Sequence, residues 1–161
     1  MKKLKIYIDT SAIGYLDEQG SPKEMLEMHQ LWDLVKQGVY EVVISPVVIR
    51  ELMVNKNIEK RDKLLEYLKQ IEYTIVEITD EVHNIAKSVI TNGILTEKSY
   101  DDCLHIGCAI SNNCDVMVSF NFKHLVNVHT IRGVRAISML QGYANLDIVQ
   151  AVALIQKGGE I

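Results

Sequence analysis

Hydrophobic and polar positions along the chain follow two periods, and each period predicts a type of element. Short runs rich in β-branched residues predict buried strands, whereas apolar residues three and four positions apart predict helices that bury one face. The predicted strands are KLKIYID (3–9), YEVVIS (40–45), YTIVEI (73–78), DVMVS (115–119) and a short VHTI (128–131). The predicted helices cover residues 21 to about 38, a segment that starts at Ser45-Pro46, and residues 57–71, 79–92, 99–113 and about 135–140.

Helix start and stop signals support this division. Ser21 is an expected N-cap, with Pro22 at the first helical position and Glu24 placed to complete a capping box. Gly38 is an expected C-cap for the same helix. The Ser45-Pro46 pair likewise predicts that a helix starts directly after the second strand.

The order of these elements predicts the fold class. Strands and helices alternate from the first residues onward, and such alternation is typical of a parallel sheet with helices on both faces. We therefore expect an α/β protein, a three-layer Rossmann-like sandwich around a central, mainly parallel sheet of four or five strands. Residues 1–161 are expected to form a single domain, because the chain shows no linker or repeat.

Composition narrows the class of protein. The chain is 48% hydrophobic and 24% charged, which is ordinary for a globular protein with a core, and no apolar run is long enough to span a membrane. The three cysteines lack the spacing of a zinc site, so a cytoplasmic protein is expected. A net charge of −4 argues against binding nucleic acid through bulk electrostatics.

Four oxygen-bearing side chains are predicted to meet at one edge of the sheet. Asp9 ends the first strand, and Glu51 lies on the helix that follows the second strand. Asp102 lies in the first turn of a buried helix, and Asn121 follows the fourth strand. Ligands bind beyond the carboxyl ends of parallel strands, and carboxylates held close together repel one another unless a cation joins them. The pattern therefore indicates a site for Mg²⁺ or Mn²⁺, which take oxygen ligands.

Structural roles compete with this interpretation. Asp9 is also a good N-cap for a following helix, and Asp102 could form a capping box with Ser99. Asp101 is an alternative to its neighbour as the third acid. His105 lies one turn after Asp102, where it could hydrogen-bond a ligand acid or be a buried core histidine.

Four segments, in this order, resemble the PIN-domain family, including the VapC-type toxins of bacterial toxin–antitoxin pairs. They are YIDTSAIGYL, SPVVIREL, DDCLHIGCAI and VMVSFNFKHLVN, the last with the NFKH sequence of one branch of the family. The resemblance implies a Rossmann-like sheet and a metal-dependent nuclease that acts most often on RNA. It also implies that Asp9, Glu51 and Asp102 are the family's three acids. Asn121 stands where many members have a fourth aspartate.

The resemblance also implies partners: an RNA substrate, an antitoxin protein and a second copy of the chain in a homodimer. An alternative is a PIN fold that no longer cleaves and serves as an RNA-binding or protein-interaction module, since Asn121 removes one charge from the site. An aspartate-dependent phosphotransferase would need a second acid at Ser11. Tyr15 and Tyr100 are the only large aromatic rings expected near the site, which gives base stacking little support.

Overall fold

A five-stranded parallel sheet forms the centre of the computed structural model, which describes residues 2–155. The strand order is β3-β2-β1-β4-β5, and every neighbouring pair is parallel. The strands are β1 (Lys5–Ile8), β2 (Glu41–Ile44), β3 (Thr74–Ile75), β4 (Val116–Val118) and β5 (Asp147–Val149). The helices are α1 (Thr10–Gly14), η1 (Tyr15–Asp17), α2 (Pro22–Lys36), α3 (Pro46–Met53), α4 (Ile58–Lys69), α5 (Asp80–Thr91), η2 (Glu97–Ser99), α6 (Tyr100–Ser111), α7 (Val128–Leu140) and α8 (Val152–Ile155).

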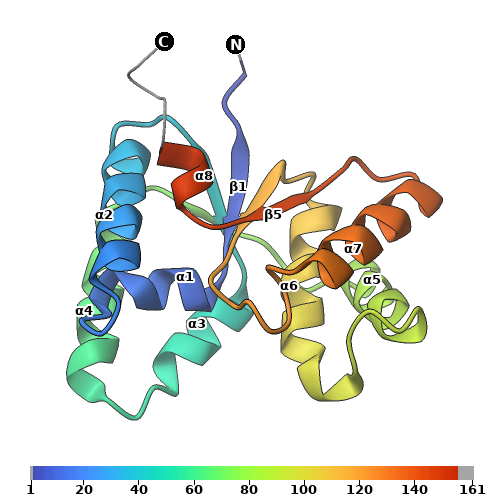
Figure 1. The fold of residues 1–161 in the computed structure, drawn as a ribbon, viewed down its shortest axis with the longest axis horizontal. Helices are drawn as coiled ribbons and strands as arrows, with labels where there is room; N and C mark the ends of the chain where they lie inside the picture. Colours follow the sequence, from blue (N-terminus) through green and yellow to red (C-terminus); the bar gives the residue numbers. More distant parts are fainter. Residues whose placement is uncertain (1, 156–161) are drawn as a thin grey trace.

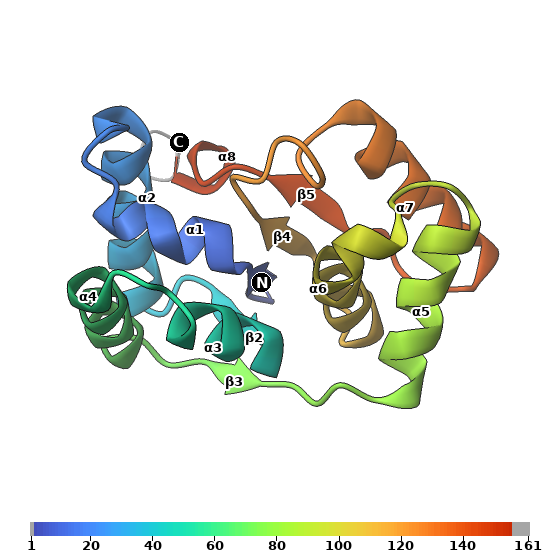
Figure 2. The same cartoon turned by 90° about the horizontal axis from the view of Figure 1, so that it is seen from below.

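Helices cover both faces of the sheet. Helices α1 to α4 and α8 lie on one side, and α5, α6 and α7 lie on the other (Figure 1). Seen from below, α1, α3 and α6 lie around the carboxyl end of β1 (Figure 2). The predicted three-layer α/β sandwich with a parallel sheet is therefore confirmed.

The central strand β1 sits at the middle of the core. Ile6, Tyr7 and Ile8 are 0% exposed, because this strand is paired on both edges and covered on both faces. Tyr7 lies level with Val43 on β2 and with Met117 on β4. The residue that follows β1 therefore emerges at the centre of the sheet's carboxyl edge.

Three expectations about the elements were wrong or incomplete. The predicted VHTI strand and the helix after it are one helix, α7, because Asn127 caps its start and Thr130, Val134 and Ile137 bury one helical face. The third strand has only two ladder residues, both exposed, since it lies at the edge of the sheet. The hydrophobic pattern also gives no sign of α1, β5 and α8, which are all five residues long or shorter.

The expected caps of α2 were partly confirmed. The helix begins at Pro22, but the Ser21 side chain makes no capping hydrogen bond, so the predicted capping box is absent. Gly38 has φ +79, the left-handed conformation that ends helices at little cost for glycine. Within residues 2–155, no helix is both long enough and apolar enough to cross a bilayer.

Helices α5 and α6 pack at unusually short range. A Cβ atom added at Gly107 of α6 would lie 2.7 Å from the carbonyl oxygen of Val82 on α5. Only glycine allows this approach, since a contact of that length is not tolerated by a methyl group. The close packing fixes α6, whose first turn carries Asp101 and Asp102, against the sheet.

Candidate functional site

Asp9 lies directly after β1 and is the N-cap of α1. Its Oδ1 accepts hydrogen bonds from the Ala12 amide at 2.9 Å and from Ser11 Oγ at 2.7 Å. Its Oδ2 accepts from Ser119 Oγ, at the end of β4, at 2.6 Å. The residue is 2% exposed, so both oxygens are held by protein groups. The capping role expected from the sequence is thus present.

Among the described residues, no cationic side chain is hydrogen-bonded to Asp9. Burial raises the pKa of this carboxyl, and this effect exceeds the lowering by the nearby His105 charge and by the hydrogen bonds from Ser119, Ala12 and Ser11. A buried carboxylate whose hydrogen-bond donors are all neutral would be stabilised further by a cation beside it.

Glu51, on α3, is bound to a buried histidine. Its Oε1 accepts from Thr10 Oγ1 at 2.6 Å and contacts His105 Nε2 at 2.8 Å. The other ring nitrogen of His105 lies 2.6 Å from the Tyr7 hydroxyl, which lies 2.8 Å from Ser45 Oγ. His105 is 2% exposed, so this chain of contacts orients Glu51 from behind.

His105 and Glu51 shift one another's pKa values in opposite directions. Burial lowers the pKa of His105, but the bond to Glu51 and the charges of Asp9, Glu51 and Asp102 raise it above 6.5 in sum. Burial raises the pKa of Glu51, but the hydrogen bond and charge of His105 bring it below 4.5. His105 and Glu51 therefore favour each other's charged forms.

Asp102 and Asp101 have different surroundings. Asp102 Oδ2 lies 2.9 Å from His124 Nδ1, and its Oδ1 accepts from Asn121 Nδ2 at 3.4 Å. Asp101 instead accepts a 2.7 Å hydrogen bond from Arg50 on α3, in an ion pair exposed to solvent. The carboxylate that faces Asn121 is therefore that of Asp102. The capping box with Ser99 is absent, because the Ser99 side chain makes no capping bond.

Asn121 is joined to the same network. Its backbone amide donates to Ser119 Oγ at 3.0 Å, and its side-chain oxygen accepts from the His124 amide at 3.0 Å. Ser119 thus links Asn121 to Asp9, while Asn121 links directly to Asp102. Asp9, Asp102 and Asn121 are connected through Ser119 and His124. Glu51 is held separately, by His105 and by Thr10, the residue after Asp9.

The network was tested for its fit to a divalent cation. Among residues 2–155, no group of three or more His, Cys, Asp or Glu side chains is arranged to hold a metal ion. The donor chemistry nevertheless suits a hard cation, since the set offers carboxylate and amide oxygens and Asp9 receives its hydrogen bonds from neutral groups. The residues fit the ion in chemistry and charge, and the assignment of Asp9, Glu51, Asp102 and Asn121 as its ligands stays a prediction.

Sequence reasoning missed part of the site. Both roles expected of His105 are present, since it is buried and bonded to an acid, but its particular partners, Glu51 and Tyr7, depend on tertiary structure and leave no spacing signal. Phe122 was not expected near the site, yet it directly follows Asn121 and is 47% exposed. Because Phe122 directly follows Asn121, which was expected at the site, its position near the site could have been predicted.

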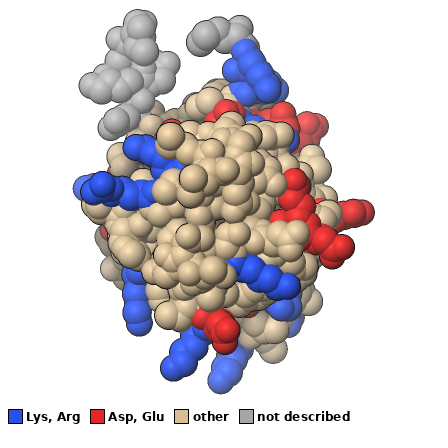
Figure 3. Space-filling view, turned by 90° about the vertical axis from the view of Figure 1, so that its right-hand side faces the viewer, with Lys and Arg blue, Asp and Glu red and all other residues tan. Residues whose placement is uncertain are grey.

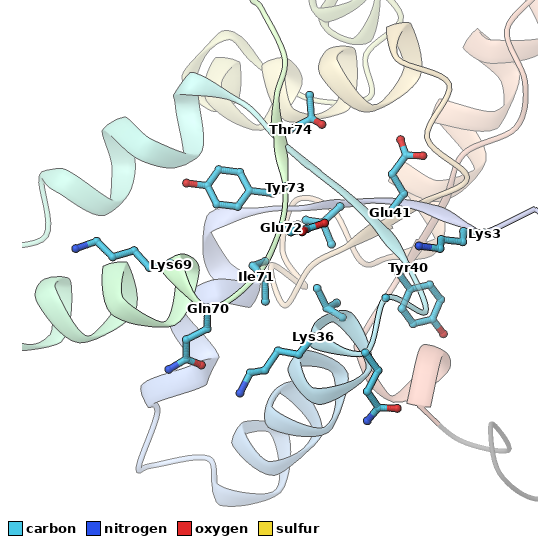
Figure 4. A pocket seen from close by; sticks show the side chains of 14 residues that line it. Lys3, Lys36, Tyr40, Glu41, Lys69, Gln70, Ile71, Glu72, Tyr73 and Thr74 are labelled. Carbon is cyan, nitrogen blue, oxygen red and sulfur yellow. The ribbon is translucent and has the colours of Figure 1, made fainter.

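A hollow in the described surface lies elsewhere. It has a volume of about 670 Å³ and is found where β2 and β3 begin, at the opposite end of the sheet from Asp9 (Figure 4). Lys3, Lys36 and Lys69 are among its lining residues, and none of the four candidate residues is. The candidate site is therefore distinct from this hollow.

Comparisons with known proteins were made with the whole chain. The sequence model of the PIN domain matches residues 6–127. No curated protein matches the chain. Among solved structures, a chain in the crystal structure of VapBC2 from Rickettsia felis bound to a DNA fragment from their promoter has a TM-score of 0.57. The two chains are 16% identical over 90% of this chain and 97% of that one, a likeness in fold. Because the PIN model spans most of the sequence, the chain belongs to the PIN domain family.

Proposed function

We propose that this protein is a Mg²⁺- or Mn²⁺-dependent endoribonuclease. The observation that carries the proposal is the hydrogen-bonded network at the carboxyl edge of a PIN-family sheet. In it, Ser119 joins Asp9 to Asn121, Asn121 contacts Asp102, and Thr10, the residue after Asp9, binds Glu51. In the described part of the chain no lysine or arginine forms an ion pair with these three acids, whose basic contacts are His105 and His124. This supports the proposal, because no permanently charged side chain neutralises the acids. Family membership supports nuclease chemistry in general.

Asp9, Glu51, Asp102 and Asn121 would hold the cation through their oxygens. When bound, the cation would supply an activated water and stabilise negative charge on the phosphodiester. Ser119 and Ser11 fix both oxygens of Asp9, so that acid is oriented before substrate binds. Thr10 and His105 do the same for Glu51.

No protein nucleophile is needed for this reaction. The three cysteines are poor candidates, because burial raises the pKa of Cys103 to about 12, of Cys108 to about 11 and of Cys114 to about 12. These thiols are buried and stay protonated near neutral pH. Water is the remaining nucleophile for phosphodiester hydrolysis.

The test is cleavage of single-stranded RNA with Mn²⁺ by the wild type and by three single variants. Asp9→Asn and Asp102→Asn should abolish cleavage, whereas Asp101→Asn should retain it, because Asp101 pairs with Arg50 on the surface. An exposed ion pair contributes only about 0–1 kcal/mol, so this control should also fold. Cleavage that survives both Asp9→Asn and Asp102→Asn would refute the proposal.

A second candidate is a non-cleaving PIN fold that binds RNA or protein. The hydrogen bonds that already occupy Asp9, Asp102 and Asn121 favour it, because metal binding would have to displace some of them. A metal-dependent rise in melting temperature that is lost in Asp9→Asn would separate the two candidates. RNA binding without cleavage or metal-dependent stabilisation would favour the second.

A toxin role in a toxin–antitoxin pair is part of the proposal. The similarity in fold to a chain of VapBC2 supports it, and an antitoxin would then be a partner. The surface over α5 and α7 carries few charged side chains in its middle (Figure 3), and Val128, Met139 and Leu140 of α7 are 70%, 75% and 83% exposed. An apolar surface of this kind supports a protein partner, such as a second copy of the chain.

A further inference from the structure

An aromatic cluster extends from the core to the surface beside the candidate site. The rings of Tyr15 and Phe120 are stacked, with centroids 4.3 Å apart and planes at 27°. The ring of Phe122 meets Phe120 edge to face, with centroids 6.2 Å apart and planes at 88°. Phe120 is 4% exposed and Phe122 is 47% exposed, so the cluster ends in an open aromatic face.

Nothing in the chemistry of the Phe122 side chain explains why it is exposed to solvent. Phenylalanine has no polar atom that gains from water, and half of its ring is left outside a core that could bury it. Among the described residues, the large aromatic side chains that are similarly exposed are Tyr73 and Phe122. Tyr73 lies at the far end of the sheet, beside the hollow in Figure 4.

The loop that carries Phe122 is held in one conformation. The amides of Leu125 and Val126 donate to the Asn121 carbonyl at 2.9 Å. The Asn127 side chain donates to the carbonyls of Phe122 and Lys123 at 3.1 and 3.0 Å. The ring is therefore presented on a preorganised support, and binding to it costs little ordering of the backbone.

We infer that Phe122 is a stacking platform for one unpaired base of a single-stranded RNA substrate. The inference rests on the proposed ribonuclease function of the neighbouring acids. Phe122 follows Asn121, which contacts Asp102, so a base on the ring brings its adjoining phosphate beside the acids. Lys123, the next residue, is exposed and supplies a charge for the RNA backbone.

Stacking and charge contacts differ in their dependence on salt. Stacking of one base on an aromatic ring corresponds to about a 5- to 150-fold gain in affinity. This gain does not involve release of counterions, whereas a lysine–phosphate contact does. Phe122→Ala should weaken binding equally at low and high salt, and Lys123→Ala should reduce the salt dependence itself.

The experiment is fluorescence anisotropy of a labelled single-stranded RNA with the full chain in EDTA, where metal-dependent cleavage is absent. Phe122→Ala should lower affinity by about 5- to 150-fold, while Tyr73→Ala, the matched aromatic control, should leave it unchanged. Phe122→Trp should bind at least as tightly as the wild type, with quenching of the new indole by RNA. Trp32 is 1% exposed and should give a constant background.

Three results would overturn the inference: undetectable RNA binding by the wild type, unchanged affinity in Phe122→Ala, or equal dependence on Phe122 for a duplex of the same sequence. Unchanged affinity is also the result expected if the ring serves a protein partner.

Cleavage assays separate this inference from the proposed function. If the wild type never cleaves RNA but binding depends on Phe122, the ribonuclease proposal fails and the platform stands. If cleavage occurs and Phe122→Ala matches the wild type in both assays, only the platform fails.

Discussion

Replacing Tyr7 by phenylalanine removes one oxygen atom from the centre of the structure. That oxygen contacts His105 Nδ1 at 2.6 Å and Ser45 Oγ at 2.8 Å, and the tyrosine is 0% exposed. Burial raises the pKa of Tyr7 well above its ordinary 10.0, so the hydroxyl stays protonated. Ser45 Oγ keeps a bond from the Val47 amide, whereas no other hydrogen bond holds His105 Nδ1 among the described residues.

The expected loss of stability comes from His105 Nδ1, which is left without a hydrogen-bond partner. Leaving one buried polar group without a partner costs about 1–3 kcal/mol, which lowers the melting temperature of a chain of this length by about 2–12 °C. Tyr40→Phe is the matched control, because its hydroxyl donates to the Leu154 carbonyl at a half-buried position that water can reach. That variant should lose less than about 1 kcal/mol.

Urea denaturation of the two variants, with the protein free of divalent cations, measures both losses. A double-mutant cycle between Tyr7→Phe and Glu51→Gln then reports whether the two residues are coupled through His105. A loss in Tyr7→Phe no larger than in Tyr40→Phe would contradict the reasoning. A coupling energy of zero would show that Tyr7 does not support Glu51.

Three further predictions concern packing, pH and loop anchoring. Gly107→Ala should lower the free energy of unfolding by about 1–3 kcal/mol, because its Cβ would meet the Val82 carbonyl. Gly14→Ala, whose Cβ would have no atom within 4 Å, should raise the free energy of unfolding by up to about 1 kcal/mol. Urea denaturation measures the sign of both changes. The pKa of His105 is raised in the folded protein, so its pairing with Glu51 is fully stabilising below pH 6.5 and this stabilisation is lost as the pH rises through the raised value. With divalent cations removed by a chelator, His105→Gln should therefore lose more stability relative to the wild type at about pH 6 than at about pH 9. Asn127→Ala should cost more stability than Asn57→Ala, another N-cap, since only Asn127 also holds the Phe122 loop; equal melting temperatures would contradict this.

The sequence predicted the elements that have a strong period or a local cap. Strand β1, helix α3 after the Ser45-Pro46 pair and helix α5 were all expected near their observed positions. Residues 128–131 were assigned to a strand because Val128, Thr130 and Ile131 are β-branched. The Asn127 cap and the buried side of the helix outweighed that preference.

The sequence proposes the acids of the candidate site but not the contacts that hold them, and their role as ligands stays a prediction. The position of Asp9 after a central strand follows from the alternation of strands and helices. The contact between His105 and Glu51 joins residues 54 positions apart, and the Tyr7–His105 contact joins residues 98 apart. Such pairs depend on how α6 meets the sheet, which no local pattern encodes. The choice between Asp101 and Asp102 likewise depends on the direction of each side chain.

The position of β1 between β2 and β4 has a consequence for synthesis of the chain. Asp9 is translated before its partner Ser119, which comes 110 positions later, and before the neighbouring strand β4. A nascent polypeptide on the ribosome therefore carries an incomplete centre until those residues have been added. The proposed ribonuclease site would stay unassembled until β4 has been translated.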